Sequence, residues 1–577
     1  MSDFDKKLVQ YGILAKNGKQ DIKDNKITIF DAEIKEINFQ TLQEAGIKEI
    51  CIFESEIKYL YFLEKNTIKI DFRNCNFKNH IIARELYFKN EVIFQQCIFD
   101  AVVDFSKAEF NSKIDFSLSV FKGEVRFIET QFSAEQSDNK TIENNFREVI
   151  FEGKTIFDNA TFQARVCFAL SQFKEEVRFI ETQFQAEQSN NETIENDFRE
   201  VIFEGRTSFS NTTFKARVCF GLSQFKDEVR FIGTQLLAKQ SSNRKIIENE
   251  FMETIFKGKV TFDSLVLKAR IGFSFSIFKD EALFLNINPN NFIFYNVEFN
   301  KTKFACKTLT NVIFCLFQYS VFKDALSFKG MKFERLEFDN VLFNGVVTFS
   351  NTKLNTKPQF INCTFSNQFN IEHQYIKYSD KDIENKINNI QDKNDKFRAL
   401  LNLRDLFRKL KSNRIAHHNL IDASELRTQE LYTRELELKY QENKSLREKI
   451  ERWQLFFYRK LCDHHTDLLL NAKWLLYIVA LYVLLLGKMI WVYPVLIIIF
   501  LASIYLCKIK NIWLNLSSIT VLIAIVCCPK MIFGFTNLFT EKLNCWQNLI
   551  TTVYVVVIGL VLFSLQKTAR KNSIVPS

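Results

Sequence analysis

The feature that most constrains the fold is the return of phenylalanine at steps of five and six residues. From residue 173 to residue 225 the Phe-to-Phe steps run 6, 5, 14, 5, 6, 5, 6 and 5. Neither the period of about 3.6 residues of a helix nor the period of about 2 of a strand produces these steps. The chain has 62 Phe among its 577 residues. Such frequent use of one large apolar side chain indicates a recurring structural slot.

Longer blocks of the sequence repeat as well. FKGEVRF begins at Phe121, and FKEEVRF and FKDEVRF begin at Phe173 and Phe225, each 52 residues after the one before. A degenerate copy, FKDEALF, follows 53 residues later at Phe278. Internal duplications of this length predict a solenoid of stacked coils. If each step is one side of a four-sided coil, the step of 14 is a side that carries a loop of about eight extra residues, and each 52-residue unit makes two coils.

The residue two places before most of these Phe is small or β-branched, as at Val177 and Thr182. Alternate residues of a strand point to the same side, so each side of a coil is expected to send one Phe and one smaller residue inward. Cys75, Cys97 and Cys363 occupy the smaller position and are predicted to fill the core. The Phe predicted to form the core of the central coils are Phe151, Phe157, Phe162, Phe168, Phe173, Phe179, Phe203, Phe209, Phe214 and Phe220.

The runs VDFSKAEFNSKIDFSLSVF (103–121) and LSFKGMKFERLEFDNVLFNGVVTF (326–349) resemble the pentapeptide-repeat family. That resemblance covers about residues 28–370 and implies a right-handed quadrilateral β-helix with a large apolar residue at the centre of each side. The strong preference for Phe, the steps of six and the inserted loops depart from the family pattern. About fourteen coils at a strand spacing of about 4.8 Å would form a rod on the order of 65 Å long, with residues 1–27 as an N-terminal cap.

After the Phe rhythm ends, residues 379–460 are predicted to form a helical linker. Apolar residues such as Ile383, Ile387 and Leu403 recur at helical spacing, and the chain is expected to turn back near residues 412–419. A second helix is expected from about Asp422, continuing through ELYTRELELKYQENKSLREKIERW. The basic segment RDLFRKLKSNR (404–414) is interpreted as a solvated helix face, with contact to anionic lipid headgroups as the alternative.

The C-terminal part is apolar enough to suggest a bundle of about four transmembrane helices over residues 468–565. The four candidate spans are Leu468–Gly487, Met489–Cys507, Ile512–Cys528 and Asn548–Leu565. Basic residues precede the first span, separate the second from the third, and follow the fourth in the tail 566–577. By the positive-inside rule these sites share the cytoplasmic side of the inner membrane. Both termini and the β-helix are therefore expected in the cytoplasm.

Charge and cysteine usage agree with that placement. The net charge is −5 over residues 101–250 and +8 over residues 451–577, so the basic excess flanks the apolar segments rather than the large domain, and no nucleic-acid partner is expected. The opening sequence MSDFDKKLVQYGILAKNG has no long apolar run, and the 13 Cys show no disulfide-framework spacing. We expect these Cys to be reduced.

The sequence contains few candidates for metal-binding, ion-conducting or catalytic residues. Cys462, His464 and His465 are candidate metal ligands, but neighbouring side chains on a helix diverge by about 100° and the CxxC and HxxxH spacings are missing. The segment CPKMIFGFTNLF (528–539) is a candidate re-entrant loop, although it lacks the TVGYG-like pattern of a potassium filter. We find no catalytic constellation and predict neither an enzyme nor a bound cofactor.

The sequence therefore favours a scaffold for protein–protein interaction that is anchored in the lipid bilayer. An unknown protein partner would bind the sides of the β-helix or the three inserted corner loops, residues 133–145, 185–197 and 237–250. The alternative is an ion channel or other membrane conduit that uses the β-helix as a regulatory domain. Mimicry of DNA, known in some pentapeptide-repeat proteins, is disfavoured because this domain is only mildly acidic.

Overall fold

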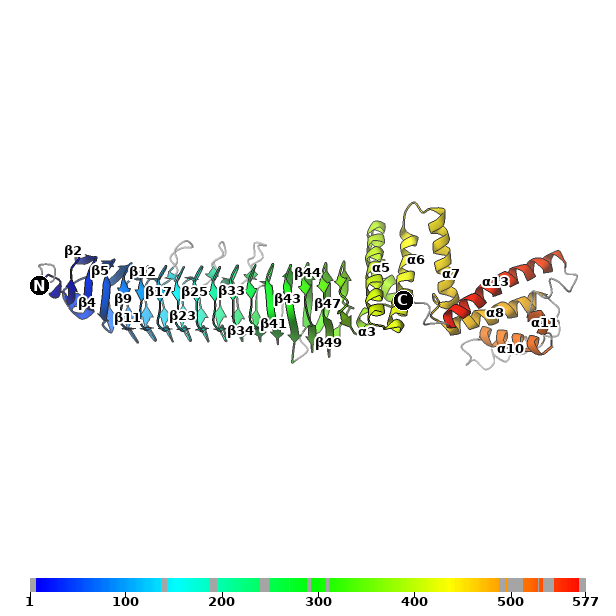
Figure 1. The fold of residues 1–577 in the computed structure, drawn as a ribbon, viewed down its shortest axis with the longest axis horizontal. Helices are drawn as coiled ribbons and strands as arrows, with labels where there is room; N and C mark the ends of the chain where they lie inside the picture. Colours follow the sequence, from blue (N-terminus) through cyan, green and yellow to red (C-terminus); the bar gives the residue numbers. More distant parts are fainter. Residues whose placement is uncertain are drawn as a thin grey trace. The chain divides into compact units, whose positions relative to one another are not determined.

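The computed structural model describes residues 7–135, 143–186, 195–238, 248–268, 270–287, 292–307, 311–486, 494, 512–527, 529–532 and 544–569. The chain divides into two compact units, Met1–Ile376 and Lys377–Ser577, and each is described by itself. The first unit is a β-solenoid over residues 26–371, and a helical region follows. This confirms the predicted order of a β-helical solenoid and then helices. The strands of the solenoid, coloured from blue to green, stack one coil on the next (Figure 1).

Each regular coil of the solenoid contains four short strands. Two consecutive coils consist of β21 (Ile150–Phe151), β22 (Thr155–Ile156), β23 (Thr161–Phe162), β24 (Val166–Cys167), β25 (Gln172–Phe173), β26 (Val177–Arg178), β27 (Gln183–Phe184) and β28 (Glu195–Asp197). Parallel pairing joins β21 to β25, β22 to β26, β23 to β27 and β24 to β28, which gives four faces. About 14 such coils are present.

The pairing register explains the repeat length. Ile150 pairs with Gln172, whereas Cys167 pairs with Asp197, so the second pairing encloses a longer stretch of chain than the first. The difference is the loop of eight extra residues that the step of 14 predicts. One coil of each length makes up the 52-residue unit.

The interior is filled by columns of Phe rings. All ten Phe predicted to form the core are buried. Along one face Phe151 stacks on Phe173 with 4.7 Å between ring centroids, and Phe173 stacks on Phe203 at 5.2 Å. Rings from neighbouring faces meet edge to face, as Phe168 and Phe179 do at 5.6 Å. Both geometries are favoured by the quadrupole of an aromatic ring.

The smaller inward position satisfies buried backbone groups as well as filling space. Ser171 Oγ donates a hydrogen bond to the carbonyl oxygen of Phe146 at 2.6 Å, and Thr182 Oγ1 donates to that of Phe157 at 2.7 Å. Cys97 lies in the same slot and contacts the carbonyl oxygen of Phe72 through Sγ at 3.4 Å. A hydroxyl or thiol here gives a buried carbonyl a partner that an apolar residue would not.

Both ends of the solenoid depart from the regular coil. At the N-terminal end, β1 (Ile13–Lys16) runs antiparallel to β4 (Glu33–Asn38), and β2 (Lys19–Lys23) runs antiparallel to β3 (Lys26–Phe30). In these pairs β1 and β2 cover the edges of β4 and β3, which would otherwise be free to pair with another chain. The remaining N-terminal elements are α2 (Phe39–Glu44), β5 (Glu49–Phe53) and β6 (Glu56–Tyr61).

Near the C-terminal end the strands lengthen. The long strands are β41 (Ile277–Leu285), β43 (Glu298–Ala305), β44 (Asn311–Gln318) and β47 (Lys332–Asp339). The last strands are β52 (Thr364–Phe365) and β53 (Asn370–Ile371), followed by α3 (His373–Ile376). The hydroxyl of Tyr375 donates to the carbonyl oxygen of Phe349 at 3.0 Å and ties α3 to the last coils.

The helices of the second unit are α4 (Asp380–Asn388), α5 (Lys393–Ala416), α6 (Leu420–Tyr440), α7 (Leu446–Cys462), α8 (Leu468–Leu486), α10 (Ile512–Cys527), α11 (Pro529–Ile532) and α13 (Cys545–Ala569). The predicted helical hairpin is formed by α5 and α6. The prediction of one helix from Asp422 through Trp453 is wrong, because the chain breaks between α6 and α7. Asn443 adopts a left-handed φ of 49° there, and Ser445 begins α7 with a capping box that pairs it with Glu448.

The basic segment 404–414 also differs from its prediction. Only part of it is a solvated face: Arg408 is exposed, whereas Arg404 lies 2.8 Å from Glu437 of α6 and Lys411 lies 2.6 Å from Glu430. Arg414 is nearly buried, with 5% of its side chain exposed, and faces Asp422. Three of the five cations of this segment thus face acidic residues of α6, which the linear sequence does not place opposite α5.

Within the described part of the chain two helices, α8 and α13, are long and apolar enough to cross a membrane, and α10 is a shorter apolar helix. In the order α8, α13 and α10 they correspond to the first, fourth and third candidate spans, of which Gly487 and Cys528 lie outside the described residues. Apart from Pro494, the second candidate span, Met489–Cys507, lies outside the described residues, as does most of the basic tail. The helices α8 and α13 pack against each other through the stacked rings of Tyr482 and Tyr554, whose centroids are 3.7 Å apart.

Candidate functional site

The flat faces of the solenoid carry ion pairs that run from coil to coil. Asp100 lies between Lys78, at 2.9 Å, and Lys122, at 2.7 Å, so three successive coils are linked. Hydrogen bonds from Lys122 and Lys78 hold the pKa of Asp100 below its ordinary value. The same arrangement joins Glu204 to Lys226 at 2.7 Å. Charges that neutralise one another in this way make a poor electrostatic footprint for nucleic acid.

One corner of the solenoid differs from these faces because it exposes large apolar side chains. The apolar corner comprises Leu222, Met252, Phe275, Tyr295 and Tyr319, which are 48%, 37%, 45%, 38% and 51% exposed. They lie in successive coils, since the amide of Leu222 donates to the carbonyl oxygen of Met252 at 2.8 Å and that of Phe275 to Tyr295 at 2.9 Å. The ring of Tyr295 contacts Phe275 at 5.6 Å and Tyr319 at 5.5 Å.

The backbone at the apolar corner makes these residues unexpected. Leu222, Phe275 and Tyr319 have φ values of 62°, 59° and 52°, in the left-handed region where a bulky side chain is uncommon. Asn340 and Asn362 occupy the same corner position in later coils, with φ values of 54° and 52°. Large apolar residues in a strained and solvated position contribute nothing to the core, which points to a role in binding.

Sequence reasoning missed this corner, although a signal is present. Three of the corner residues lie three places before the first Phe of the next face, as in LSQF at Leu222, FSIF at Phe275 and YSVF at Tyr319, and Met252 and Tyr295 lie four places before it. This signal is easily overlooked, because the corner residues do not interrupt the periodic spacing of the inward Phe.

The three predicted corner loops lie mainly outside the described residues, which omit 136–142, 187–194 and 239–247. The strands before them are β19 (Gln131–Phe132), β27 and β35 (Gln235–Leu236). One parallel ladder contains all three, with β23 and β31 (Thr213–Phe214) between them. The inserts therefore leave the solenoid at the same corner in every second coil.

The candidate metal ligands lie where α7 ends, on a strained stretch of backbone. Asp463, His464 and His465 have consecutive left-handed φ values of 45°, 53° and 72°. His465 Nδ1 lies 3.4 Å from Cys462 Sγ and 3.3 Å from Ser564 Oγ of α13. Among the described residues no group of three or more His, Cys, Asp or Glu could hold a metal ion, and a tetrahedral site needs more ligands than Cys462 and His465 provide.

The electrostatics of this cluster also disfavour a reactive thiolate. Burial lowers the pKa of His464 and that of His465 to about 4, and burial raises the pKa of the Cys462 thiol above its ordinary value. Activation of a thiol by a histidine requires the opposite shifts, because the working form is a thiolate beside an imidazolium. The arrangement is that of a buried polar contact between α7 and α13.

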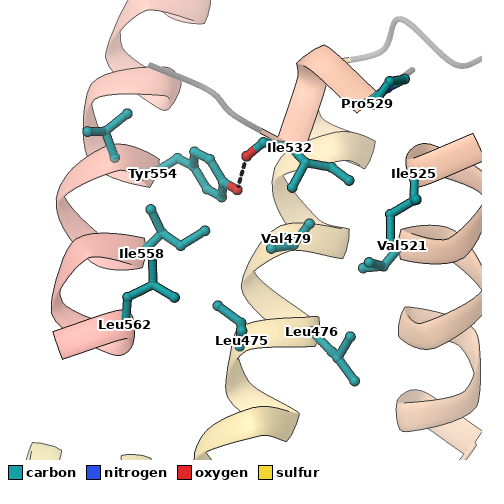
Figure 2. Close-up of a pocket in the computed structure, with 11 residues that line it drawn as sticks. Leu475, Leu476, Val479, Val521, Ile525, Pro529, Ile532, Tyr554, Ile558 and Leu562 are labelled. Carbon is teal, nitrogen blue, oxygen red and sulfur yellow. Dashed lines mark hydrogen bonds between the residues drawn. The ribbon is translucent and has the colours of Figure 1, made fainter. Parts of the chain in front are cut away.

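A cavity of about 500 Å³ lies between α8, α10, α11 and α13. Figure 2 shows its aliphatic walls, with Leu476 and Val479 of α8 on the side of Val521 of α10, and Leu475 on the side of Ile558 and Leu562 of α13. Tyr554 Oη donates to the carbonyl oxygen of Ile532 at 2.8 Å. The described lining thus suits hydrocarbon and gives an ion few oxygen ligands. Of the predicted re-entrant loop, only Pro529–Ile532 is described.

No family model, curated protein or solved structure matches the chain. The fold itself defines the class to which the protein belongs: a β-solenoid repeat protein joined to a helical region that contains two helices able to cross a membrane.

Proposed function

We propose that the protein is a membrane-anchored scaffold without catalytic activity, whose solenoid binds a protein partner. The observation that carries this proposal is the apolar corner. Its side chains extend over successive coils, three of them are aromatic, and aromatic residues are enriched at the centres of protein interfaces. A solenoid presents such residues as one continuous surface, and partners commonly bind repeat proteins along surfaces of that kind.

We also propose that the chain is a divergent member of the pentapeptide-repeat family. Support comes from the four faces per coil and from the single inward Phe on each face. The sides are on average longer than those of a strict repeat of five, because steps of five and six alternate along the chain.

For the anchor, we propose four spans in the inner membrane with both termini in the cytoplasm. The helices α8 and α13 support it, as do the basic residues that flank the apolar segments. A conduit lacks comparable support, since the described cavity is lined mainly by aliphatic side chains.

Reporter fusions test the topology. Alkaline phosphatase joined after Ser577 should be inactive, and a cytoplasmic fluorescent reporter at the same place should be bright, because four spans return the chain to its starting side. The same pair of reporters before Met1 is the control for the N-terminus. An active phosphatase after Ser577 would rule out the four-span arrangement.

Site-specific photocross-linking in native membranes tests partner binding. A photoreactive amino acid at Tyr319 of the full-length protein should give one discrete protein adduct. The same amino acid at Arg206, an exposed position on another part of the coil, should not. Replacing Leu222, Met252 and Phe275 by Ser should remove the adduct, whereas exchanging the three inserts for short Gly-Ser turns should leave it. Loss with the inserts and retention in the Ser variant would place the partner on the loops and contradict the role of the apolar corner.

A further inference from the structure

The helix α7 turns its apolar side away from the protein. Leu446, Ile450, Trp453 and Phe457 are 76%, 50%, 73% and 42% exposed. Their spacing of four, three and four residues places them on one stripe of the helix. A contiguous stripe of this kind, with Trp at its centre, marks an interaction surface rather than scattered surface residues.

The opposite side of α7 holds the helix against α6 through polar contacts. Arg434 of α6 binds both carboxylate oxygens of Glu451, at 2.9 and 3.1 Å. Arg459 of α7 binds Glu435 in the same bidentate way, at 2.8 and 2.9 Å. Bidentate pairs of this kind fix orientation. The exposed stripe is therefore held outward by the contacts behind it.

Three exposed cations lie beside the stripe: Arg447, Lys449 and Lys460. A fourth exposed cation, Arg452, lies about 130° away round the helix at about 100° per residue. The acidic residues of α7 lie toward α6: Glu448 accepts from Gln441 at 2.8 Å and Glu451 pairs with Arg434. Long basic side chains that flank an apolar stripe can keep their charge in water or among phosphates while the stem covers hydrocarbon. This combination of a cationic rim and an apolar centre is complementary to an anionic lipid surface.

The position of α7 next to α8 also indicates that a lipid surface covers the stripe. Only residues 463–467 separate the two helices. At its C-terminal end α7 is fixed to the apolar helices, since Leu461 and Cys462 pack with Val561 of α13 and Trp474 Nε1 of α8 donates to the carbonyl oxygen of Lys460 at 2.8 Å. In Figure 1, α7 runs across the direction of α8 and α13. If α8 and α13 cross a bilayer, α7 lies along its surface.

We propose that α7 is an interfacial helix that buries Leu446, Ile450, Trp453 and Phe457 in the boundary between headgroups and acyl chains of an anionic membrane. This inference rests on the proposed anchoring by α8 and α13 and adds a second membrane contact. It assigns α7 the task of holding the helical linker on the membrane surface, so that the linker does not turn freely about its anchor.

Quenching by brominated lipids tests the proposal on the full-length protein in phosphatidylglycerol-containing vesicles. The difference in fluorescence between the parent and Trp453→Phe gives the emission of Trp453, and that between the parent and Trp474→Phe gives the emission of Trp474 in α8. We expect lipids brominated near the headgroup to quench most of the Trp453 emission, more than lipids brominated deep in the chain. Each variant keeps four of the five Trp, and its folding is checked by its thermal transition.

The two Trp separate the possible outcomes. Quenching of Trp474 without quenching of Trp453 overturns the role of α7 and leaves the anchor intact, whereas failure of both overturns the anchor. Emission of Trp453 that is blue-shifted but unquenched means that a second copy of the chain or another part of this chain covers the stripe, and this also overturns the proposal.

A charge variant supplies an independent readout. Changing Arg447, Lys449 and Lys460 to Gln should reduce the quenching of Trp453 and remove its dependence on phosphatidylglycerol. The control is Arg408→Gln, an exposed cation of α5, which should leave both unchanged. Equal quenching in the charge variant and the parent would contradict the electrostatic part of the proposal.

Discussion

Replacement of Phe203 by Ala should lower the local free energy of unfolding by about 3 to 5 kcal/mol, the usual cost of deleting a buried aromatic side chain. Phe203 is fully buried in β29 (Ile202–Phe203). Its ring stacks between Phe173, at 5.2 Å, and Phe225, at 4.6 Å. Because the interior is a column of rings, the hole would break contacts with the coil before and the coil after.

Hydrogen exchange measured on the full-length protein would detect this change. Amides of β29 and of the strands paired with it should exchange faster in Phe203→Ala than in the parent, while distant coils should be unaffected because each coil contacts only its neighbours. The neighbouring substitution Glu204→Ala is the matched control. It removes an exposed pair with Lys226 at 2.7 Å, and such pairs contribute at most about 1 kcal/mol. Equal effects of the two substitutions would contradict the inward assignment of Phe203.

Acidification should destabilise the junction of α7 and α13 through His464. Its side chain is 4% exposed, and Nε2 has no hydrogen-bond partner among the described residues. Burial, followed by the charge of Arg459, lowers its pKa from 6.5 to about 4. Between these two pH values the unfolded chain binds more protons than the folded one, so stability is complete above about pH 6.5 and falls as the pH drops toward 4. The loss attributable to this group reaches about 3 kcal/mol.

Thermal unfolding of the detergent-solubilised protein at several pH values would measure this loss. His464→Asn should weaken the dependence below about pH 6.5 but not abolish it, because Asn does not titrate and tolerates the left-handed backbone at this position, whereas His465, whose pKa is also lowered to about 4, still titrates. His417→Asn, at an exposed position in the turn after α5, should keep the parental dependence. An unchanged pH profile in His464→Asn would show that other groups carry the acid sensitivity.

The solenoid was predictable from the sequence because one residue type marks one structural position. The spacing of Phe173, Phe179 and Phe184 reports the length of each side, and the step of 14 before Phe198 reports the insert. The shorter and the longer pairing registers of the coils follow directly from these steps. Strand pairing in such a fold can be predicted from the sequence, since each strand of a regular coil pairs with the equivalent strand of the next coil.

The helical unit was less predictable because its contacts join positions that are distant in the sequence. Nothing local shows that Arg404 pairs with Glu437 or that Arg459 pairs with Glu435. When those pairs are not known, the sequence of the basic segment of α5 predicts a solvated helix face. The capping box at Ser445 is a local signal for the start of α7, but the continuous helical composition on both sides concealed it.

The surfaces that carry the proposals were the least visible in the sequence. Trp453 and Phe457 fit a helical period equally well as core residues or as exposed ones. Only the polar contacts of α7 with α6 decide between the two, because they assign the other side of the helix to the protein.

The alternation of shorter and longer coils also bears on how this gene can change. A loss or gain of one 52-residue block, such as residues 173–224, would join Phe-bearing strands that already share a register, so the stacking of the solenoid would continue without a fault. Each such event would shorten or lengthen the solenoid by two coils, about 10 Å, and leave both of its ends in place. Near-identical blocks are prone to unequal recombination, and this architecture turns such recombination into heritable variation in length. The reach of the solenoid can therefore evolve in fixed increments while every coil remains folded.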